Sequence, residues 1–386
     1  MFSKAAVSLV PSATLAINAR AKQLVAAGRN IISFAAGQPD FDTPEPIKAA
    51  AKRALDEGFT KYTPTTGIPE LKQVLTAKLK IKNHLRYTPE QVIISNGAKQ
   101  ILFEAIMCLV DIGDEVIIKA PYWVSYPDMV KVARGKSVII KDWDELAKKL
   151  TKKSKVLIIN SPSNPTGEII DRKGLEKIAK VIKKYPKLWV LSDECYDCFY
   201  YGGAKPISFA SLSQDAYQRT LTINAFSKTF SMTGWRLGYG AGPKELIGAM
   251  SNLQDQISSN PNSIAQKAGL VAWSQAGDFP ETMRREFKKR CQVIVTKLNQ
   301  IKGFKALLPD GAFYVWTDIR GLTKDPASAG QSDQKFCERL LEEGGVAVIP
   351  GTPFGGPGFI RLSFATSLEQ IETGIDLIKK FVEKNY

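Results

Sequence analysis

The stretch Asn224–Gly242, NAFSKTFSMTGWRLGYGAG, places a single lysine, Lys228, in a run of mostly small, apolar and aromatic residues. Lysine is among the residues least often fully buried, because its charge is costly to remove from water. An apolar setting therefore exposes a lysine, pairs it with an anion or lowers its pKa. The last of these outcomes would make the Lys228 amine a nucleophile near neutral pH.

Short apolar runs recur from roughly residue 90 to residue 240, the region that contains this lysine. They are continuously apolar rather than alternating, which is typical of strands that are covered on both faces. Amphipathic stretches such as KQILFEAIMCLVD (99–111) separate several of them and predict the covering helices. The sequence therefore predicts an α/β fold with a mostly parallel, helix-covered sheet. The runs are QVIIS (91–95), DEVIIKAP (114–121), SVIIK (137–141), KVLIINSP (155–162), LWVLSDE (188–194) and TLTINAF (220–226).

The chain length and a change of pattern near residue 290 predict two domains. At roughly 150 residues per domain, the 386 residues correspond to two or three units. We expect a large domain over residues 45–290 and a smaller α+β domain built from residues 1–44 and 291–386. The polar stretch 320–333 is expected to be a surface loop. The apolar runs of the smaller domain are GAFYVWTDI (311–319), GVAVIPG (345–351) and FIRLSFAT (359–366), and a terminal helix follows them.

The composition is that of a globular protein, with 44% apolar and 24% charged residues. We find neither a secretory signal nor an apolar stretch of about 20 residues, so we expect a cytoplasmic protein with no membrane partner. The five cysteines are an odd number in such a chain and are expected to be reduced thiols.

The chain carries a formal charge of +15, from 53 lysines and arginines against 38 acidic residues. Much of the excess lies on the polar faces of helical stretches such as DELAKKLTKKSK (144–155). No helix-turn-helix pattern accompanies it, so no nucleic-acid partner is expected, and a basic nucleic-acid-binding protein is kept only as a rival hypothesis. The single histidine, His84, argues against a histidine-dependent triad or a multi-histidine metal site.

Polar residues follow several of the predicted strands. KVLIINSP runs into a loop that contains Asn164, and LWVLSDE contains Asp193, with Tyr196 just beyond it. Ligands of open α/β sheets bind at the carboxyl ends of strands, so we expect these side chains to meet Lys228 in one region. Gly97 lies at a strand-to-helix turn, where the helix N-terminus can bind an anion, although most such turns are structural.

Eight blocks, in order along most of the chain, resemble the class I, fold-type-I pyridoxal-phosphate aminotransferases. The chain is similar in particular to the prokaryotic-type aspartate (aspartate/prephenate) aminotransferase branch. One block alone would be a weak signal, whereas eight in order are a strong one. The blocks are AAGQPDFDTP (35–44), KYTPTTGIPELK (61–72), SNGAKQ (95–100), APYWVSYP (120–127), NSPSNPTG (160–167), LSDECYD (191–197), FSKTFSMTGWRLGY (226–239) and FIRLSFATS (359–367).

The resemblance implies that Lys228 forms a Schiff base with pyridoxal 5'-phosphate and later moves a proton between the substrate's α-carbon and the cofactor. Such catalysis needs a neutral amine near neutral pH. Asp193 would pair with the pyridine nitrogen, and Tyr196 and Asn164 would hydrogen-bond the ring oxygen. The other implied cofactor contacts are Gly97, Ala98, Ser227 and Arg236 at the phosphate, Trp123 on the ring, and Tyr62 from the neighbouring subunit of a homodimer with shared active sites.

The same resemblance implies a reaction and its substrate contacts. The reaction is a ping-pong transfer of an amino group between aspartate or glutamate and a 2-oxo acid such as 2-oxoglutarate or oxaloacetate. A prephenate-preferring aminotransferase, or another pyridoxal-phosphate enzyme of the same fold, stays open as the alternative. The implied substrate contacts are Arg361, which would form a bidentate fork on the α-carboxylate, Lys99 and Thr14 at the distal carboxylate, and Gly37, Trp123 and Asn164 around the substrate.

The chain departs from the family pattern at a few positions. The segment 141–155 is shorter than expected, which suggests that a stretch near the site is trimmed. Ala225 replaces a phosphate-binding serine of many relatives, and Cys195 replaces a usual aliphatic residue. An exposed Cys195 would make the pocket open to oxidation.

Overall fold

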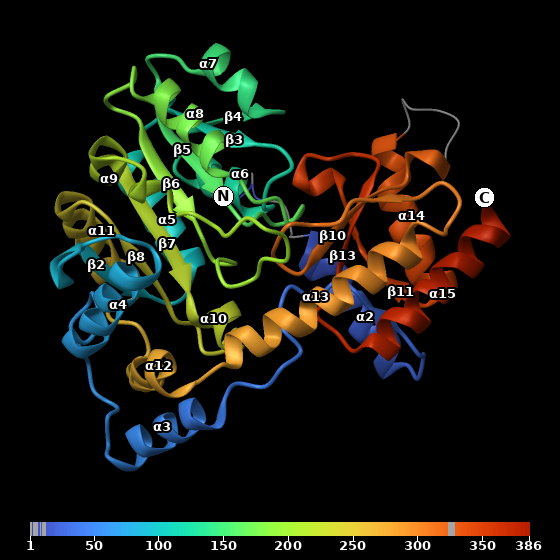
Figure 1. The fold of residues 1–386 in the computed structure, drawn as a ribbon, viewed down its shortest axis with the longest axis horizontal. Coiled ribbons are helices and arrows are strands. Elements are labelled where there is room, and N and C mark those ends of the chain that lie inside the picture. The colour runs from blue at the N-terminus through green and yellow to red at the C-terminus, as the bar shows by residue number, and fades with distance from the viewer. Residues whose placement is uncertain (1, 3–6, 8, 10–12, 323–328) are drawn as a thin grey trace.

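A seven-stranded sheet forms the centre of one part of the molecule (Figure 1). The structure is a computed structural model that describes residues 2, 7, 9, 13–322 and 329–386, with the side chains of 13, 14 and 329–332 outside the description. All six predicted strands form, and the seventh, β8, runs antiparallel to both of its neighbours. The α/β prediction is therefore confirmed. The strand order is β2 (Val92–Ser95), β8 (Gly238–Ala241), β7 (Thr220–Ala225), β6 (Trp189–Asp193), β5 (Ser154–Asn160), β3 (Glu115–Lys119) and β4 (Lys136–Ile140).

The continuous apolar runs arise because both faces of this sheet are covered by helices. Along β3, Val116 and Ile118 pack in one cluster with helices α5 (Ala98–Leu109) and α6 (Ser125–Val132). Ile117, which lies between them and faces the other way, packs with α8 (Arg172–Ile182). The hydrophobic core thus lies in two layers, one on each side of the strands.

Strand β8 was not among the predicted strands, because its sequence GYGA is half glycine. The structure shows why glycine is needed there. A Cβ atom on Gly238 would lie 2.4 Å from the backbone nitrogen of Ala98, and one on Gly240 would lie 2.9 Å from the side chain of Ile101. Helix α5 therefore packs directly on the backbone of β8, as glycine in a strand often permits.

A second part of the molecule contains a four-stranded antiparallel sheet, in the order β12 (Ile349–Pro350), β13 (Phe359–Ser363), β10 (Tyr314–Asp318) and β9 (Lys305–Ala306). Strand β1 (Ile32–Ser33) pairs in parallel with β11 (Val346–Ala347), which joins the N-terminal and C-terminal segments. Helix α2 (Ala13–Ala26) packs beside them, and Arg20 forms an ion pair with Glu342 at 2.6 Å. The domain boundaries given above stay a prediction.

The long helix α13 (Phe279–Leu298) runs from the seven-stranded part to the smaller sheet (Figure 1). Helix α14 begins at Ala329, so the last part of the stretch predicted as a loop is helical. Residues 320–322 form a short 3-10 turn, and 323–328 lie outside the described residues. Helix α14 ends at Gly344, and the other α-helices of the described residues are α3 (Glu45–Asp56), α4 (Pro69–Lys82), α7 (Leu146–Lys149), α9 (Gln214–Arg219), α10 (Phe226–Thr229), α11 (Lys244–Ile257), α12 (Ser263–Gln275) and α15 (Leu368–Asn385).

No helix within the described residues is both long and apolar enough to cross a bilayer.

Candidate active site

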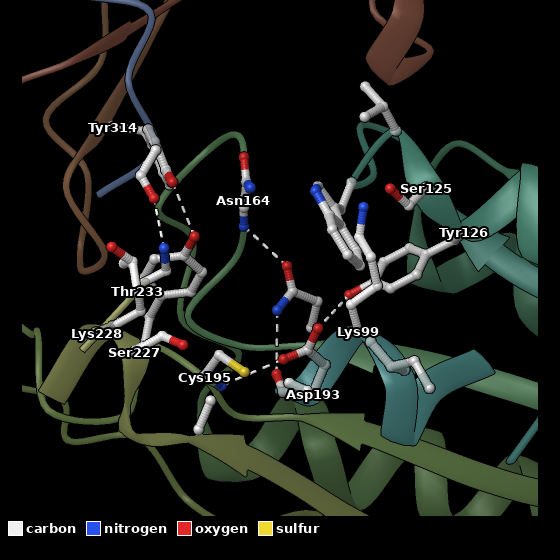
Figure 2. A pocket seen from close by; sticks show the side chains of 18 of the residues that line it. Lys99, Ser125, Tyr126, Asn164, Asp193, Cys195, Ser227, Lys228, Thr233 and Tyr314 are labelled. Atoms are coloured by element: carbon white, nitrogen blue, oxygen red, sulfur yellow. Dashed lines mark hydrogen bonds between the residues drawn. The ribbon is translucent and has the colours of Figure 1, made fainter. Parts of the chain in front are cut away.

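A cavity of about 300 Å³ opens at the carboxyl ends of the central strands. Its walls come from the segments that follow β1, β2, β3, β5, β6 and β7, from α2, and from β10 and β13 of the smaller sheet. Figure 2 shows Lys228, Asn164 and Asp193 pointing into it from three different segments. Asp193 is the one carboxylate among the described lining residues, against four cationic side chains, Lys99, Lys228, Arg236 and Arg361. The cavity is therefore suited to anionic ligands.

Lys228 lies on α10, the single helical turn that directly follows β7. Burial lowers the pKa of its ammonium to about 8, and the positive charges of Arg236 and Arg361 act in the same direction. Asp193 and Cys195 oppose this effect without reversing it. The Lys228 Nζ donates a hydrogen bond to the Gly37 carbonyl, which holds the amine at the cavity wall.

Asp193 ends β6 and is 6% exposed. Its carboxylate accepts hydrogen bonds from the Tyr126 hydroxyl at 2.7 Å and from the backbone N–H of Cys195 at 3.2 Å. Burial nevertheless raises the pKa of this carboxyl above its ordinary value. A cation placed against Asp193 would offset that cost, because an opposite charge favours the ionised form.

Gly97 and Arg236 form a cradle at the start of α5. Gly97 has a φ of 89°, and a Cβ there would lie 2.7 Å from Arg236 Nη2, so a larger residue would fill the space. Arg236 is held by the carbonyls of Thr233 and Asn96, at 2.9 and 3.2 Å. The first N–H groups of a helix have no partner within it, so Ala98 and its neighbours can bind an anion here together with the arginine. Ser227 also lines this cavity.

Arg361 comes from β13 and is 2% exposed. It donates to Asn164 Oδ1 and to the Ala35 carbonyl, both at 3.0 Å. Its Nε has no hydrogen-bond partner, and no carboxylate of the described residues lies within ion-pair distance of it. A buried guanidinium without a counter-charge is costly, so this arginine is poised to bind an anion.

Two further sets of aromatic contacts border the cavity. Tyr196 and Tyr314 face each other with their hydroxyl oxygens 2.8 Å apart. The Lys99 ammonium lies 4.9 Å from the ring centre of Trp123, and partial burial together with Arg236 lowers the pKa of Lys99. Lys99 thus points a charge at the mouth of the cavity beside a flat aromatic face.

The other positions singled out in the sequence have different outcomes. Tyr62 is 91% exposed and does not line the cavity of its own chain. Thr14 belongs to α2, but its side chain lies outside the described residues, although the next residue, Leu15, lines the cavity. None of the residues 141–155 lines the cavity, so this segment lies away from the site.

Cys195 lines the cavity but is buried. Burial raises the pKa of its thiol well above the ordinary value, which disfavours its reactive thiolate.

Tyr126 and Tyr314 are among the lining residues that the sequence analysis did not name. Tyr126 lies at the start of α6, and its contact with Asp193 depends on how this helix packs near the end of β6. Tyr314 lies in the run GAFYVWTDI, and its place beside the cavity depends on how β10 pairs with β13. The sequence carries no signal for that register.

These residues fit pyridoxal phosphate on their own chemistry. Lys228 is a lysine whose lowered pKa makes its amine available to an aldehyde. Asp193 lacks the cation that a protonated pyridine nitrogen would supply, and the space left by Gly97 beside Arg236 suits a phosphate. Within the described residues there is no group of histidine, cysteine and carboxylate side chains that could hold a metal ion.

Comparison with known proteins gives one consistent result. Residues 29–378 match the family Aminotransferase class I and II. An aspartate aminotransferase of Geobacillus stearothermophilus is 45% identical over 99% of this chain and 98% of its own length. An aspartate/prephenate aminotransferase of Cereibacter sphaeroides is 45% identical over 96% of each chain. Among solved structures, aspartate aminotransferase from Rhizobium meliloti superposes with a TM-score of 0.93 at 37% identity over 99% of each chain. The Thermus thermophilus enzyme with maleate gives 0.92 at 39% identity over 98% of this chain and 99% of that one.

Proposed function

The chain belongs to the class I and II aminotransferases, and from this premise we propose that it transfers the amino group of aspartate or glutamate to a 2-oxo acid. The family depends on pyridoxal phosphate, which when bound supplies an aldehyde for amines and a ring that accepts electrons from the substrate's α-carbon. The residues that would hold it are Lys228, Asp193, Tyr196 and Asn164, with Gly97, Ala98, Ser227 and Arg236 at the phosphate, Trp123 against the ring, and Tyr62 from a second subunit.

The observation that carries this proposal is the unpaired Arg361. Its guanidinium is buried, has no carboxylate partner among the described residues and borders the same cavity as Lys228. A planar guanidinium binds a carboxylate through two parallel hydrogen bonds, which a lysine cannot do. The α-carboxylate of an amino acid bound there would have its amino group on the Lys228 side of the cavity.

Lys99 supports a substrate with a second carboxylate. Its ammonium lies over Trp123 and borders the same cavity as Arg361, so two cations are available to one ligand. The Geobacillus relative is named for aspartate, and the Thermus structure holds maleate, which is a dicarboxylic acid. Aspartate and glutamate carry carboxylates at both ends and meet this requirement, and Thr14 would add a contact to the distal one.

Lys228 would move the proton that amino-group transfer requires. With a pKa of about 8, roughly a tenth of its amine is neutral at neutral pH, compared with a negligible fraction for an ordinary lysine. A neutral amine can accept a proton from the α-carbon of a bound substrate and return it to a neighbouring atom. The Gly37 carbonyl, which accepts a hydrogen bond from Lys228, would hold the amine on that path.

Asp193 would act as the ionised partner of the pyridine nitrogen. Its carboxylate is stabilised by the Tyr126 hydroxyl, and a protonated ring nitrogen would supply the missing positive charge. Tyr196 and Asn164 would donate hydrogen bonds to the ring oxygen. Together these residues would hold and orient the ring in the cavity that Lys228 lines.

A homodimer with shared sites is part of the proposal. Tyr62 is exposed and lies outside its own chain's cavity, so it can reach the phosphate region of a second copy. An open groove of about 430 Å³ lies beside Lys99 and Arg236 and is bordered by apolar side chains such as Phe103 and Ile257. Light scattering of the purified protein is expected to give twice the 42.5 kDa mass of the chain. A mass equal to one chain would contradict this part of the proposal.

We also place the reaction in the cytoplasm. All five cysteines are free in the structure, which is typical of proteins kept in a reducing compartment.

Isotope-labelled aspartate tests the proposed reaction. Purified protein with pyridoxal phosphate, 2-oxoglutarate and aspartate labelled at its amino nitrogen is expected to yield nitrogen-labelled glutamate together with unlabelled oxaloacetate, and Lys228→Ala is expected to yield neither product. Prephenate in place of 2-oxoglutarate tests the alternative that the Cereibacter relative's name raises. Faster transfer to prephenate than to 2-oxoglutarate would favour that alternative, and no transfer to any 2-oxo acid would reject the proposed function.

A further inference from the structure

The side chains of Tyr196 and Tyr314 are hydrogen-bonded to each other, and the role inferred below for this contact rests on the proposed function and deepens it. Their hydroxyl oxygens lie 2.8 Å apart, and both side chains border the cavity that contains Lys228. We infer that Tyr314 is a positioning residue, which donates its hydroxyl proton to Tyr196 and so directs the Tyr196 hydroxyl toward the ring oxygen of the cofactor.

The smaller sheet fixes the position of Tyr314. In the antiparallel pairing of β10 with β13, Tyr314 is opposite Ser363, and Trp316 is opposite Arg361. Tyr314 and Arg361 are thus diagonal neighbours on one face of the sheet, and the guanidinium lies 4.4 Å from the centre of the tyrosine ring. The same two strands therefore position the predicted carboxylate-binding arginine and the second phenol.

The loop around Gly37 holds the phenol from the other side. A Cβ at position 37 would lie 3.1 Å from the Tyr314 hydroxyl, so the backbone approaches that oxygen closely. The Gly37 carbonyl also accepts the hydrogen bond from Lys228. The Tyr314 hydroxyl, the Gly37 backbone and the Lys228 amine consequently form one contiguous edge of the cavity.

The number of protons on the two hydroxyls determines which tyrosine donates and which accepts. A phenol has one proton to donate, so only one of the two hydroxyls can donate to the other. Tyr196 is 6% exposed and Tyr314 is 1% exposed, so water cannot freely replace a missing partner. When Tyr196 donates its proton to the ring oxygen, its own oxygen is left to accept, and Tyr314 is the donor in place. Linked hydrogen bonds strengthen one another, so Tyr314 makes Tyr196 a better donor.

Both phenols stay protonated, as donors must. Burial raises the pKa of Tyr314 and raises that of Tyr196 well above its ordinary value, whereas the Arg361 charge lowers both. The charged groups that line the same cavity are Asp193, Lys99, Lys228, Arg236 and Arg361. Arg361 is the charge in direct contact with the pair through the Tyr314 ring.

The test compares two single hydroxyl deletions. Tyr314→Phe removes the proposed donor and keeps the ring that Arg361 covers. Tyr201→Phe is the matched control, because Tyr201 is also buried and its hydroxyl donates to the Ala312 carbonyl outside the cavity. Each variant is purified with pyridoxal phosphate, and its melting temperature is compared with that of the wild type.

The first readout is the pH midpoint at which the visible absorbance of the bound cofactor changes. Weaker donation from Tyr196 leaves the ring oxygen more basic, so the Tyr314→Phe midpoint is expected to move to higher pH by about 0.4 to 1 unit. Tyr201→Phe is expected to keep the wild-type midpoint. A Tyr314→Phe midpoint equal to that of Tyr201→Phe would overturn the inference, whatever the melting temperatures.

The second readout separates positioning from packing. Tyr314→Phe is expected to lower kcat for aspartate about three- to tenfold and to leave KM nearly unchanged. In a Tyr196→Phe background, Tyr314→Phe is expected to have no further effect on the midpoint, because the hydroxyl that it orients is gone. An additive effect of the two substitutions would contradict the inference. Failure of the wild type to transfer an amino group would reject the proposed function instead, so the two failures are distinguishable.

Discussion

The Tyr126 hydroxyl donates a hydrogen bond of 2.7 Å to Asp193 Oδ2, from a position at the start of α6 that is fully buried. This contact joins the helix after β3 to the carboxyl end of β6. Asp193 also accepts a hydrogen bond from the Cys195 backbone N–H, so donors from two segments hold its carboxylate.

Tyr126→Phe is expected to weaken binding of pyridoxal phosphate. Hydrogen bonds to charged groups contribute roughly 1.5 to 3 kcal/mol, so the dissociation constant is expected to rise about ten- to 150-fold. The loss follows because Asp193 becomes a weaker partner for a protonated ring nitrogen. Titration of the cofactor-free protein, followed by absorbance, measures the constant. Tyr122→Phe on the same segment is the control, and equal constants for the two variants would contradict the predicted role of Tyr126.

The reactivity of Lys228 is expected to rise with pH through about 8. Only the neutral amine attacks an aldehyde, and burial lowers the pKa of Lys228 from 10.5, so the neutral form dominates above about pH 8. Cofactor-free protein is mixed with pyridoxal phosphate over a range of pH, and the attached product is trapped by borohydride and located by mass spectrometry. Lys228→Ala corrects for other lysines. A midpoint near the ordinary lysine pKa would show that the site does not activate this amine.

Arg361→Lys is expected to reduce kcat/KM for aspartate about ten- to 150-fold, because one charge-assisted hydrogen bond of a bidentate pair is lost. The change should appear for amino acids with and without a second carboxylate, because all of them carry the α-carboxylate. Arg320→Lys is the matched control, since Arg320 pairs with Asp318 at an exposed end of the same sheet. Steady-state kinetics measure kcat/KM for both variants. A similarly small change in the two variants would argue against Arg361 as the residue that binds the α-carboxylate.

Lys99→Gln is expected to change the choice of substrate rather than the chemistry. Loss of the ammonium at the cavity mouth should lower kcat/KM for aspartate about tenfold, since an ion pair to a carboxylate is removed. Alanine, which lacks the second carboxylate, should be affected little. Lys267→Gln provides the control, because Lys267 lies over Phe59, outside the cavity. An equal loss of kcat/KM for aspartate and alanine would mean that Lys99 does not bind the distal carboxylate.

The sequence was sufficient to predict the central sheet and the convergence of its strand ends. Runs such as KVLIINSP are apolar throughout because both faces of the sheet are covered, and this pattern is independent of distant parts of the chain. The strand β8 was missed because glycine has a low propensity for strands. Its glycines are required by the close approach of α5, and the strand propensities of the residues do not reveal such a tertiary contact.

The site residues that could be predicted are those whose position is set by the neighbouring strand in the sequence. Asp193 ends β6 and Lys228 lies on the helical turn after β7, so their place at the sheet edge could be predicted from the pattern. Tyr314 reaches the cavity through the register between β10 and β13 in the smaller sheet, and Tyr126 through the packing of α6 under Asp193. Both positions depend on tertiary contacts, and such contacts leave no recognisable pattern in a single sequence.

The central claim is that this chain accepts an amino group from a dicarboxylic amino acid through a cofactor held on Lys228. The most direct measurement is the absorbance spectrum of the purified protein with pyridoxal phosphate, recorded before and after addition of L-aspartate without any 2-oxo acid. The account predicts that the visible band of the bound aldehyde form disappears and is replaced by the spectrum of the amine form, with release of oxaloacetate. A bound aldehyde spectrum that aspartate leaves unchanged would contradict it.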